Sequence, residues 1–242
     1  MAIEFFKRFI MIKKLITQIV FSKFFSKISF KFFLNFHNFL YKFISKQASM
    51  LSEDGNHPKQ NILKYKEWFN ENISNDEVVL DIGSNKGDLP FFLSKKVQYV
   101  YGIEISQSLF HEAQKRNKYS NVEFFHGDAT NFLFDSIRPI SSVTMSNVLE
   151  HIFDRVNFLK NLVANVPWRD INDKRFLIRV PMVNRDWLTI YKKNSGVEWR
   201  LDQTHYVEYN METFKEELQK ASIYVEDSFV KFGEIYAICR AE

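Results

Sequence analysis

Cysteine is almost absent from this chain of 242 residues, whose single thiol belongs to Cys239. One cysteine excludes an intramolecular disulfide framework, and no cleavable signal sequence is visible, so we expect a protein of the reducing cytoplasm. Glycine and proline are both missing from residues 1–54. They first appear in the stretch EDGNHP, residues 53–58, which predicts a boundary between an N-terminal helical segment, residues 1–50, and a domain over residues 51–242.

Long apolar runs are missing from the N-terminal segment. Its longest uncharged stretch, residues 32–41, is far shorter than the ~20 residues that a membrane-spanning helix needs. Helical spacing instead places polar and apolar side chains on opposite sides. The polar side consists of Lys23, Lys27, Lys31, Asn35, Asn38, Lys42 and Lys46. The apolar side consists of Phe21, Phe25, Ile28, Phe32, Phe36, Phe39 and Phe43.

Such an amphipathic helix is typical of a segment that lies in the interface of an anionic membrane. It would hold the protein as a peripheral membrane protein on the inner face of the cell membrane. Amphipathic helices also pack on their own domain or on a second copy in a homo-oligomer. The pattern leaves both interpretations open.

Acidic residues are nearly missing from the same segment, where nine Lys or Arg residues stand against Glu4 in residues 1–46. That part carries +8, and because the whole chain carries +4, residues 47–242 carry −4. A cationic surplus spread over the domain would indicate a nucleic-acid partner. The surplus lies in one terminal segment, so we expect no nucleic-acid partner.

Beyond residue 60, short β-rich stretches alternate with helical ones. The expected strands are residues 77–82, 98–104, 121–126, 142–146, 175–180, 223–230 and 234–241, and the expected helices are residues 88–95, 107–118, 154–165 and 211–222. Alternation of this kind predicts an α/β fold with a mostly parallel sheet and helices on both faces. The last two strands are joined by a short connection that contains Gly233, too short for a parallel crossover, so the last strand should be antiparallel.

The turn after the first strand, VVLDIGSNKGDL at residues 78–89, lacks the glycines of a dinucleotide site. Counted from Gly83, Asn85 and Asp88 occupy the two other glycine positions. Asp81 at the strand end would repel a pyrophosphate. The ligand of this turn should therefore carry positive charge, such as an ammonium group.

The motif DIGSNKG resembles the first motif of the class I S-adenosylmethionine-dependent methyltransferases, although Asn85 replaces the usual middle glycine. The resemblance implies that Asp81 and the glycine turn hold the methionine moiety of the cofactor. It also implies that Glu104, in YGIEIS, bonds both ribose hydroxyls, and that Asp128, in FFHGDAT, accepts from the adenine amino group. The segment MSNVLEHI is similar to the one that faces the cofactor after the fourth strand.

The likeness covers about residues 57–242 and implies a Rossmann-like sheet of seven strands. The residues that it implies in binding S-adenosyl-L-methionine are Asp81, Gly83, Ser84, Asn85, Gly87, Glu104, Ile105, Asp128, Ala129, Ser146, Asn147 and Val148. Singly, such residues also serve as turn or helix-capping residues. Their joint placement at the ends of successive strands favours a cofactor site, because open α/β sheets bind ligands at that edge.

The signatures of two acceptor classes are missing. The family signature for an exocyclic or amide nitrogen, an asparagine or aspartate followed by two prolines and an aromatic, is replaced by SNVLEH. A proline–cysteine nucleophile for pyrimidine carbon is absent, because Cys239 lies in the last strand. We therefore expect methylation of an oxygen on a small molecule, a sugar or a lipid-linked glycan. The alternatives are a nitrogen or carbon acceptor, a nonenzymatic membrane-attached module that retains the fold, and a dehydrogenase-like Rossmann protein.

Residues 181–210 are expected to recognise the acceptor, because the connection after the fifth strand covers the active site in this family and is here rich in aromatic and polar residues. Trp187 and Trp199 fit substrate contact and ordinary packing equally well. Arg185, Arg200 and Asp202 are equally consistent with ion pairs among themselves.

His151 or His205 is the expected catalytic base, since imidazole has an unperturbed pKa of ~6.5. The other histidines have no metal-ligand spacing with acids or with Cys239, so we expect no metal. His57, Lys59 and Tyr65, before the first strand, are expected lid residues.

Overall fold

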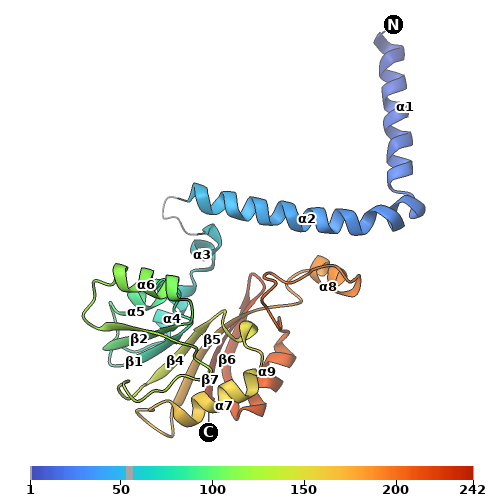
Figure 1. Cartoon of the computed structure of the whole chain (residues 1–242). Coiled ribbons are helices and arrows are strands. Elements are labelled where there is room, and N and C mark those ends of the chain that lie inside the picture. The colour runs from blue at the N-terminus through green and yellow to red at the C-terminus, as the bar shows by residue number, and fades with distance from the viewer. Residues whose placement is uncertain (1, 53–56, 242) are drawn as a thin grey trace. The chain divides into compact units, whose positions relative to one another are not determined.

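The computed structural model describes residues 2–52 and 57–241 of the chain (Figure 1). Most of the predicted break at residues 53–58 lies outside the described residues, because residues 53–56 are not among them. The chain divides into two compact units. One contains the N-terminal helices and Ile190–Trp199, and the other contains Lys59–Thr189 and Arg200–Glu242.

The N-terminal unit contains two helices, α1 (Ala2–Val20) and α2 (Lys23–Leu51). Neither helix contains the glycine or proline that would interrupt it. Ser22 separates them and caps α2, because its hydroxyl accepts from the backbone N–H of Phe25 at 3.2 Å. The predicted N-terminal helical segment is confirmed. None of the described helices is both long and apolar enough to pass through a bilayer.

The two sides of α2 have different surroundings. On the polar side, the side-chain amide of Asn38 donates to the backbone carbonyl of Glu198 at 2.7 Å and accepts from Lys192 Nζ at 2.6 Å. On the apolar side, successive rings stack with centroids 6.1 to 6.5 Å apart, namely those of Phe32, Phe36, Phe39 and Phe43. These four residues, named here the phenylalanine stripe, are exposed.

The domain is built on one seven-stranded sheet in the order β3-β2-β1-β4-β5-β7-β6. The strands are β1 (Val78–Ile82), β2 (Tyr99–Glu104), β3 (Val122–His126), β4 (Ser142–Ser146), β5 (Lys174–Pro181), β6 (Ile223–Lys231) and β7 (Glu234–Ala241). The first five strands are parallel, and β7 is antiparallel to both β5 and β6. Phe232 and Gly233 form the predicted short connection, both with positive φ. The predicted fold, a mostly parallel sheet with an antiparallel last strand, is confirmed.

Helices cover both faces of this sheet (Figure 1). The helical elements that follow α2 are α3 (Pro58–Leu63), α4 (Tyr65–Glu71), α5 (Asp88–Leu93), α6 (Gln107–Arg116), the 3-10 helix η1 (Leu149–His151), α7 (Arg155–Asn165), α8 (Trp187–Asn194) and α9 (Met211–Lys220). Alternate residues of β1 enter different cores: Leu80 packs in the core with α7 and α9, and Val79 packs in the core with α4 and α5. All of β1 is therefore buried, as in a central parallel strand.

The segment expected to be a loop, residues 181–210, differs from that expectation because it contains α8. The carboxylate of Asp186 accepts from the backbone N–H of Thr189 at 2.6 Å, a local bond that satisfies a donor of the first helical turn.

Candidate active site

The turn after β1 needs residues that tolerate positive φ. Gly83, Asn85 and Gly87 have φ values of +71°, +51° and +86°. A Cβ on Gly83 would lie 2.6 Å from Cγ2 of Val148, so that position requires glycine for space as well as for conformation. Asparagine is the residue that best replaces glycine in the left-handed region. The turn therefore keeps its shape although Asn85 stands where the family has glycine.

Asp81, at the end of β1, has a buried carboxylate that is 2% exposed. It accepts from the hydroxyl of Thr144 at 2.7 Å. Burial raises the pKa of Asp81 to about 7, the Thr144 hydrogen bond lowers it, and the nearby Glu104 carboxylate raises it. A cation bound beside this group would favour its ionised form. The Asp81 carboxylate at this turn therefore fits the ammonium group of an amino acid moiety.

Glu104, at the end of β2, connects two loops. One carboxylate oxygen accepts from the backbone N–H of Asn85 at 2.7 Å, and the other accepts from that of Ser106 at 2.8 Å. Each carboxylate oxygen has two lone pairs, so each keeps acceptor capacity for a ligand hydroxyl. The N-cap of α6 is Ser106, so Glu104 does not have the capping role that was its alternative.

A cavity of about 540 Å³ lies beside these strand ends. Its lining includes, from the predicted cofactor set, Gly83, Ile105, Asp128, Ala129 and Val148, and from the predicted catalytic pair, His151. Cavities of this size hold small molecules and cofactors. The other predicted cofactor residues belong to the same loops and strand ends but do not line the cavity.

Asp128 has the turn geometry that its sequence context allowed. One carboxylate oxygen accepts from the backbone N–H of Thr130 at 2.9 Å and from its hydroxyl at 2.8 Å. The other oxygen has no hydrogen-bond partner among the described residues, so it can accept from a ligand in the cavity that Asp128 lines. Turn formation and ligand binding are therefore compatible at this residue.

Two buried polar atoms at the strand ends have no hydrogen-bond partner in the described part of the chain. They are the hydroxyl oxygen of Ser84 and the side-chain oxygen of Asn147. Asn147 follows β4 with a φ of +57° and donates its backbone N–H to the carbonyl of Arg179 at 2.8 Å. Buried polar atoms are normally paired. An unpaired oxygen beside a cavity fits a site that binds a polar ligand.

The two predicted base residues lie together although they are far apart in the sequence. The rings of His151 and His205 have centroids 4.7 Å apart, at an interplanar angle of 80°. His205 is buried, and its Nδ1 lies 3.0 Å from the carboxylate of Glu208. Burial lowers the pKa of His151, and so does the neighbouring His205. Neutral imidazole is the form that accepts a proton.

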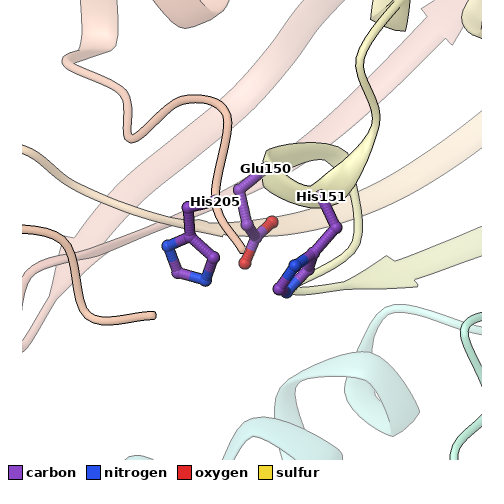
Figure 2. Close-up of side chains that lie close together, drawn as sticks. All are labelled: Glu150, His151 and His205. Carbon is purple, nitrogen blue, oxygen red and sulfur yellow. The ribbon is translucent and has the colours of Figure 1, made fainter. Parts of the chain in front are cut away.

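Glu150 was not among the predicted site residues. Its carboxylate lies beside both imidazole rings (Figure 2). The side chain is fully buried, and both oxygens lack a hydrogen-bond partner in the described part of the chain. Burial raises the pKa of Glu150 to about 8. Its position next to His151 in NVLEHI was the one signal in the sequence.

The polar residues of the acceptor segment contact other residues of the same segment. Arg185 forms an ion pair with Glu208, and Arg200 donates to the backbone carbonyl of His205 at 3.0 Å. The carboxylate of Asp202 accepts from the backbone and the hydroxyl of Thr204. These contacts hold the strand-to-helix connection that carries His205.

Two of the predicted lid residues contact charged side chains. Lys59 forms an ion pair with Glu234 at 2.5 Å, and the buried Tyr65 lies under the guanidinium of Arg179 at 4.3 Å. His57 precedes α3. Trp187 is 74% exposed, and its contact with the acceptor stays a prediction. Trp199 lies in the N-terminal unit, where Lys193 Nζ stands over its ring at 4.8 Å.

Comparisons with known proteins agree with this geometry. Residues 79–166 match the family model described as a methyltransferase domain. An uncharacterized protein of Methanocaldococcus jannaschii is 32% identical over 113 residues, which cover 41% of this chain and 43% of that protein. The matched part therefore spans less than half the length of this curated relative.

Two solved structures share the fold. Magnesium protoporphyrin IX methyltransferase from Synechocystis PCC 6803 with bound SAH, 17% identical, superposes with a TM-score of 0.56 over 76% of this chain and 83% of its own. A small RNA methyltransferase, HEN1, is 20% identical and superposes with a TM-score of 0.59 over 74% of this chain and 25% of its own.

The sheet order, the turn after β1 and the cavity define an α/β domain with a ligand cavity beside the ends of its parallel strands. With the family match, the class becomes specific. Residues 79–166 match the methyltransferase domain family, the sheet has the fold of solved S-adenosylmethionine-dependent methyltransferases, and the cofactor is S-adenosyl-L-methionine.

Proposed function

We propose that this protein transfers a methyl group from S-adenosylmethionine to an oxygen atom of a small molecule, a sugar or a lipid-linked glycan. The observation that carries the proposal is the position of His151 on the wall of the cofactor cavity, next to His205. A hydroxyl acceptor must lose a proton during methyl transfer. A pair of imidazoles at the cavity supplies a place for that proton.

The cofactor, when bound, supplies a methyl group already activated on a sulfonium. The protein then has to align the acceptor and take its proton. Nδ1 of His151 lies 3.0 Å from the hydroxyl oxygen of Thr204. Its Nε2 has no hydrogen-bond partner among the described residues, so it can accept from an acceptor hydroxyl in the cavity.

The acceptor can be tested directly by mass spectrometry. Lipid extracts, surface glycans and hydrolysed RNA from cells with and without the gene would be compared for a missing methyl group. We expect the lost methyl group on an oxygen of a glycan or lipid fraction. A loss confined to nitrogen or carbon would contradict the oxygen assignment. A loss confined to RNA would contradict the acceptor class, and the RNA fraction is included because one structural neighbour is an RNA methyltransferase.

We further propose that the phenylalanine stripe binds an anionic membrane, so that a lipid-linked acceptor is held near the domain. The stripe supports this proposal because its four rings are exposed and form one continuous apolar row. Residues 1–46 carry +8. Basic residues near an anionic surface contribute about 1 kcal/mol each, and aromatic burial adds to this.

We expect the full chain to sediment with anionic liposomes at low salt, and rising salt to weaken binding through screening. Replacing Phe32, Phe36 and Phe39 by Ser should abolish the binding that salt leaves. The matched control replaces two exposed apolar residues of the domain, Leu133→Ser and Ile171→Ser, and should bind like the unchanged chain.

One result would contradict the membrane proposal. The intact protein would stay in solution with anionic liposomes at low salt, while removal of residues 1–46 broke a homo-oligomer or exposed an aggregating domain. The phenylalanine stripe would then be a packing surface between copies of the chain.

A further inference from the structure

Three side chains beside the cavity, those of Glu150, His151 and His205, lie close together (Figure 2). Glu150 and His151 come from η1, and His205 comes from the connection between α8 and α9. Each offers one ligand atom, and the three atoms lie within 4.8 Å of one another. Small side-chain rotations would bring them to the spacing of ligands around one metal ion, whose bonds to nitrogen and oxygen are ~2.0–2.2 Å long.

Glu150 gives an independent reason to expect a cation here. Its side chain is 0% exposed, and both carboxylate oxygens lack a hydrogen-bond partner in the described residues. Buried carboxylates are otherwise paired with donors, with cations or with metal ions. The nearest guanidinium that acts on it, that of Arg179, forms its own ion pair with Glu234. A bound cation would give the Glu150 oxygens the partner that they lack.

The hydrogen bonds of the two histidines set their tautomers. The Thr204 hydroxyl donates to the carboxylate of Asp202 at 2.8 Å, so its oxygen accepts from Nδ1–H of His151. A Glu208 oxygen, which also accepts from the backbone N–H of Leu201, accepts from Nδ1–H of His205.

The proton on Nδ1 leaves the lone pair on Nε2 in both rings. Metal-binding histidines are typically held in this way, with the second nitrogen donating to a carboxylate or another oxygen. The outer contacts of this cluster are therefore those of a metal site.

We propose that Glu150, His151 and His205 bind one divalent transition-metal ion at the wall of the cofactor cavity. Two imidazoles and one carboxylate suit zinc with a fourth position left for substrate. They also suit manganese or iron, whereas magnesium prefers oxygen ligands and water. The expectation that the chain has no metal rested on spacing along the sequence, and the fold brings His205 to a pair 54 residues away.

The role of the ion rests on the proposed oxygen methylation. A divalent ion lowers the pKa of a coordinated hydroxyl. The acceptor would give its proton to solvent, its oxygen would form the bond to the methyl carbon, and the bond between that carbon and sulfur would break. With the ion bound, the two histidines would assist the loss of this proton as metal ligands, and His151 would accept the proton directly only in the metal-free protein.

Metal binding can be measured without methyl transfer. We expect the full-length protein, stripped with a chelator, to bind one equivalent of Zn²⁺ or Mn²⁺ in calorimetry, and Mg²⁺ at least tenfold more weakly. Glu150→Gln and His205→Asn should each weaken Zn²⁺ or Mn²⁺ binding at least tenfold. The control His111→Asn, which changes an exposed histidine of α6, should bind like the unchanged protein.

The proposal would be overturned by three results: no binding of either ion, equal binding by Glu150→Gln, or weakened binding by His111→Asn. The exposed side chain of His151 allows a further variant, His151→Asn, if either buried substitution prevents folding. Calorimetry with S-adenosylmethionine on the same samples separates the two ideas. If the unchanged protein did not bind S-adenosylmethionine, the proposed function would be contradicted. Metal binding would still be measured independently.

Discussion

Replacing His151 by alanine is expected to lower the rate of methyl transfer by about 10²–10⁴-fold, the usual contribution of a group that assists proton transfer. The imidazole lines the cavity. Its Nε2 is the atom that can accept the proton of the substrate hydroxyl, or bind a metal ion that lowers the pKa of that hydroxyl. The substitution removes no contact of the glycine turn. Binding of S-adenosylmethionine should therefore stay within a few-fold of the unchanged protein.

The measurement is single-turnover transfer from labelled S-adenosylmethionine, with cofactor affinity measured by calorimetry on the same sample. His111→Ala serves as the control because that histidine is exposed on α6. If His151→Ala and His205→Ala both kept the turnover of the unchanged protein, neither residue would take part in the mechanism. A loss of cofactor affinity that matches the loss of rate would assign His151 to cofactor binding.

Replacing Glu104 by alanine is expected to weaken S-adenosylmethionine binding by roughly 10- to 150-fold. A hydrogen bond to a charged group is worth about 1.5–3 kcal/mol, and Glu104 is expected to accept from both ribose hydroxyls. The structure adds a second reason. The same carboxylate accepts from the backbone N–H groups of Asn85 and Ser106, so its loss also loosens the turn.

Calorimetry should rank the variants in the order unchanged protein, Glu104→Gln, Glu104→Ala, because glutamine keeps one acceptor oxygen. Glu123→Ala is a matched control, since Glu123 lies on the next strand, is exposed, and accepts a hydrogen bond from the Tyr99 hydroxyl at 3.3 Å. Unchanged affinity in Glu104→Ala would mean that the ribose binds elsewhere.

The parts of the fold that depend on neighbouring residues were predictable. Short apolar runs such as residues 78–80 in β1 predict buried parallel strands, and the short connection at Gly233 predicts an antiparallel pair. The turn at Gly83 was likewise visible in the sequence, because a strand followed by closely spaced small residues has few conformations. Whether these residues bind the cofactor as expected stays a prediction.

The features that depend on distant residues were not predictable. His205 reaches Glu150 because the connection after β5 returns to η1, where the backbone N–H of Tyr206 donates to the carbonyl of Glu150 at 2.7 Å, and no local pattern encodes that path. The grouping of Ile190–Trp199 with α2 has the same origin, because Asn38 and Glu198 are 160 residues apart. That both carboxylate oxygens of Glu150 lack a hydrogen-bond partner in the described part of the chain depends on the positions of all neighbouring groups, which the sequence alone does not give.

If Asp81 holds the cationic end of the cofactor as expected, its buried carboxyl makes the stability of the fold depend on cofactor binding. Its pKa is raised from 3.8 to about 7 by burial, so between these pH values the folded chain holds a proton that the unfolded chain has released. The free energy of unfolding of the cofactor-free protein should therefore fall as pH rises from about 4 to about 7, and this loss is complete above pH 7. A cationic cofactor favours the ionised carboxylate and counteracts the loss, since a ligand that binds only the folded state stabilises it. At neutral pH, a cell that runs short of S-adenosylmethionine would thus hold a less durable enzyme, with a shorter lifetime against proteolysis.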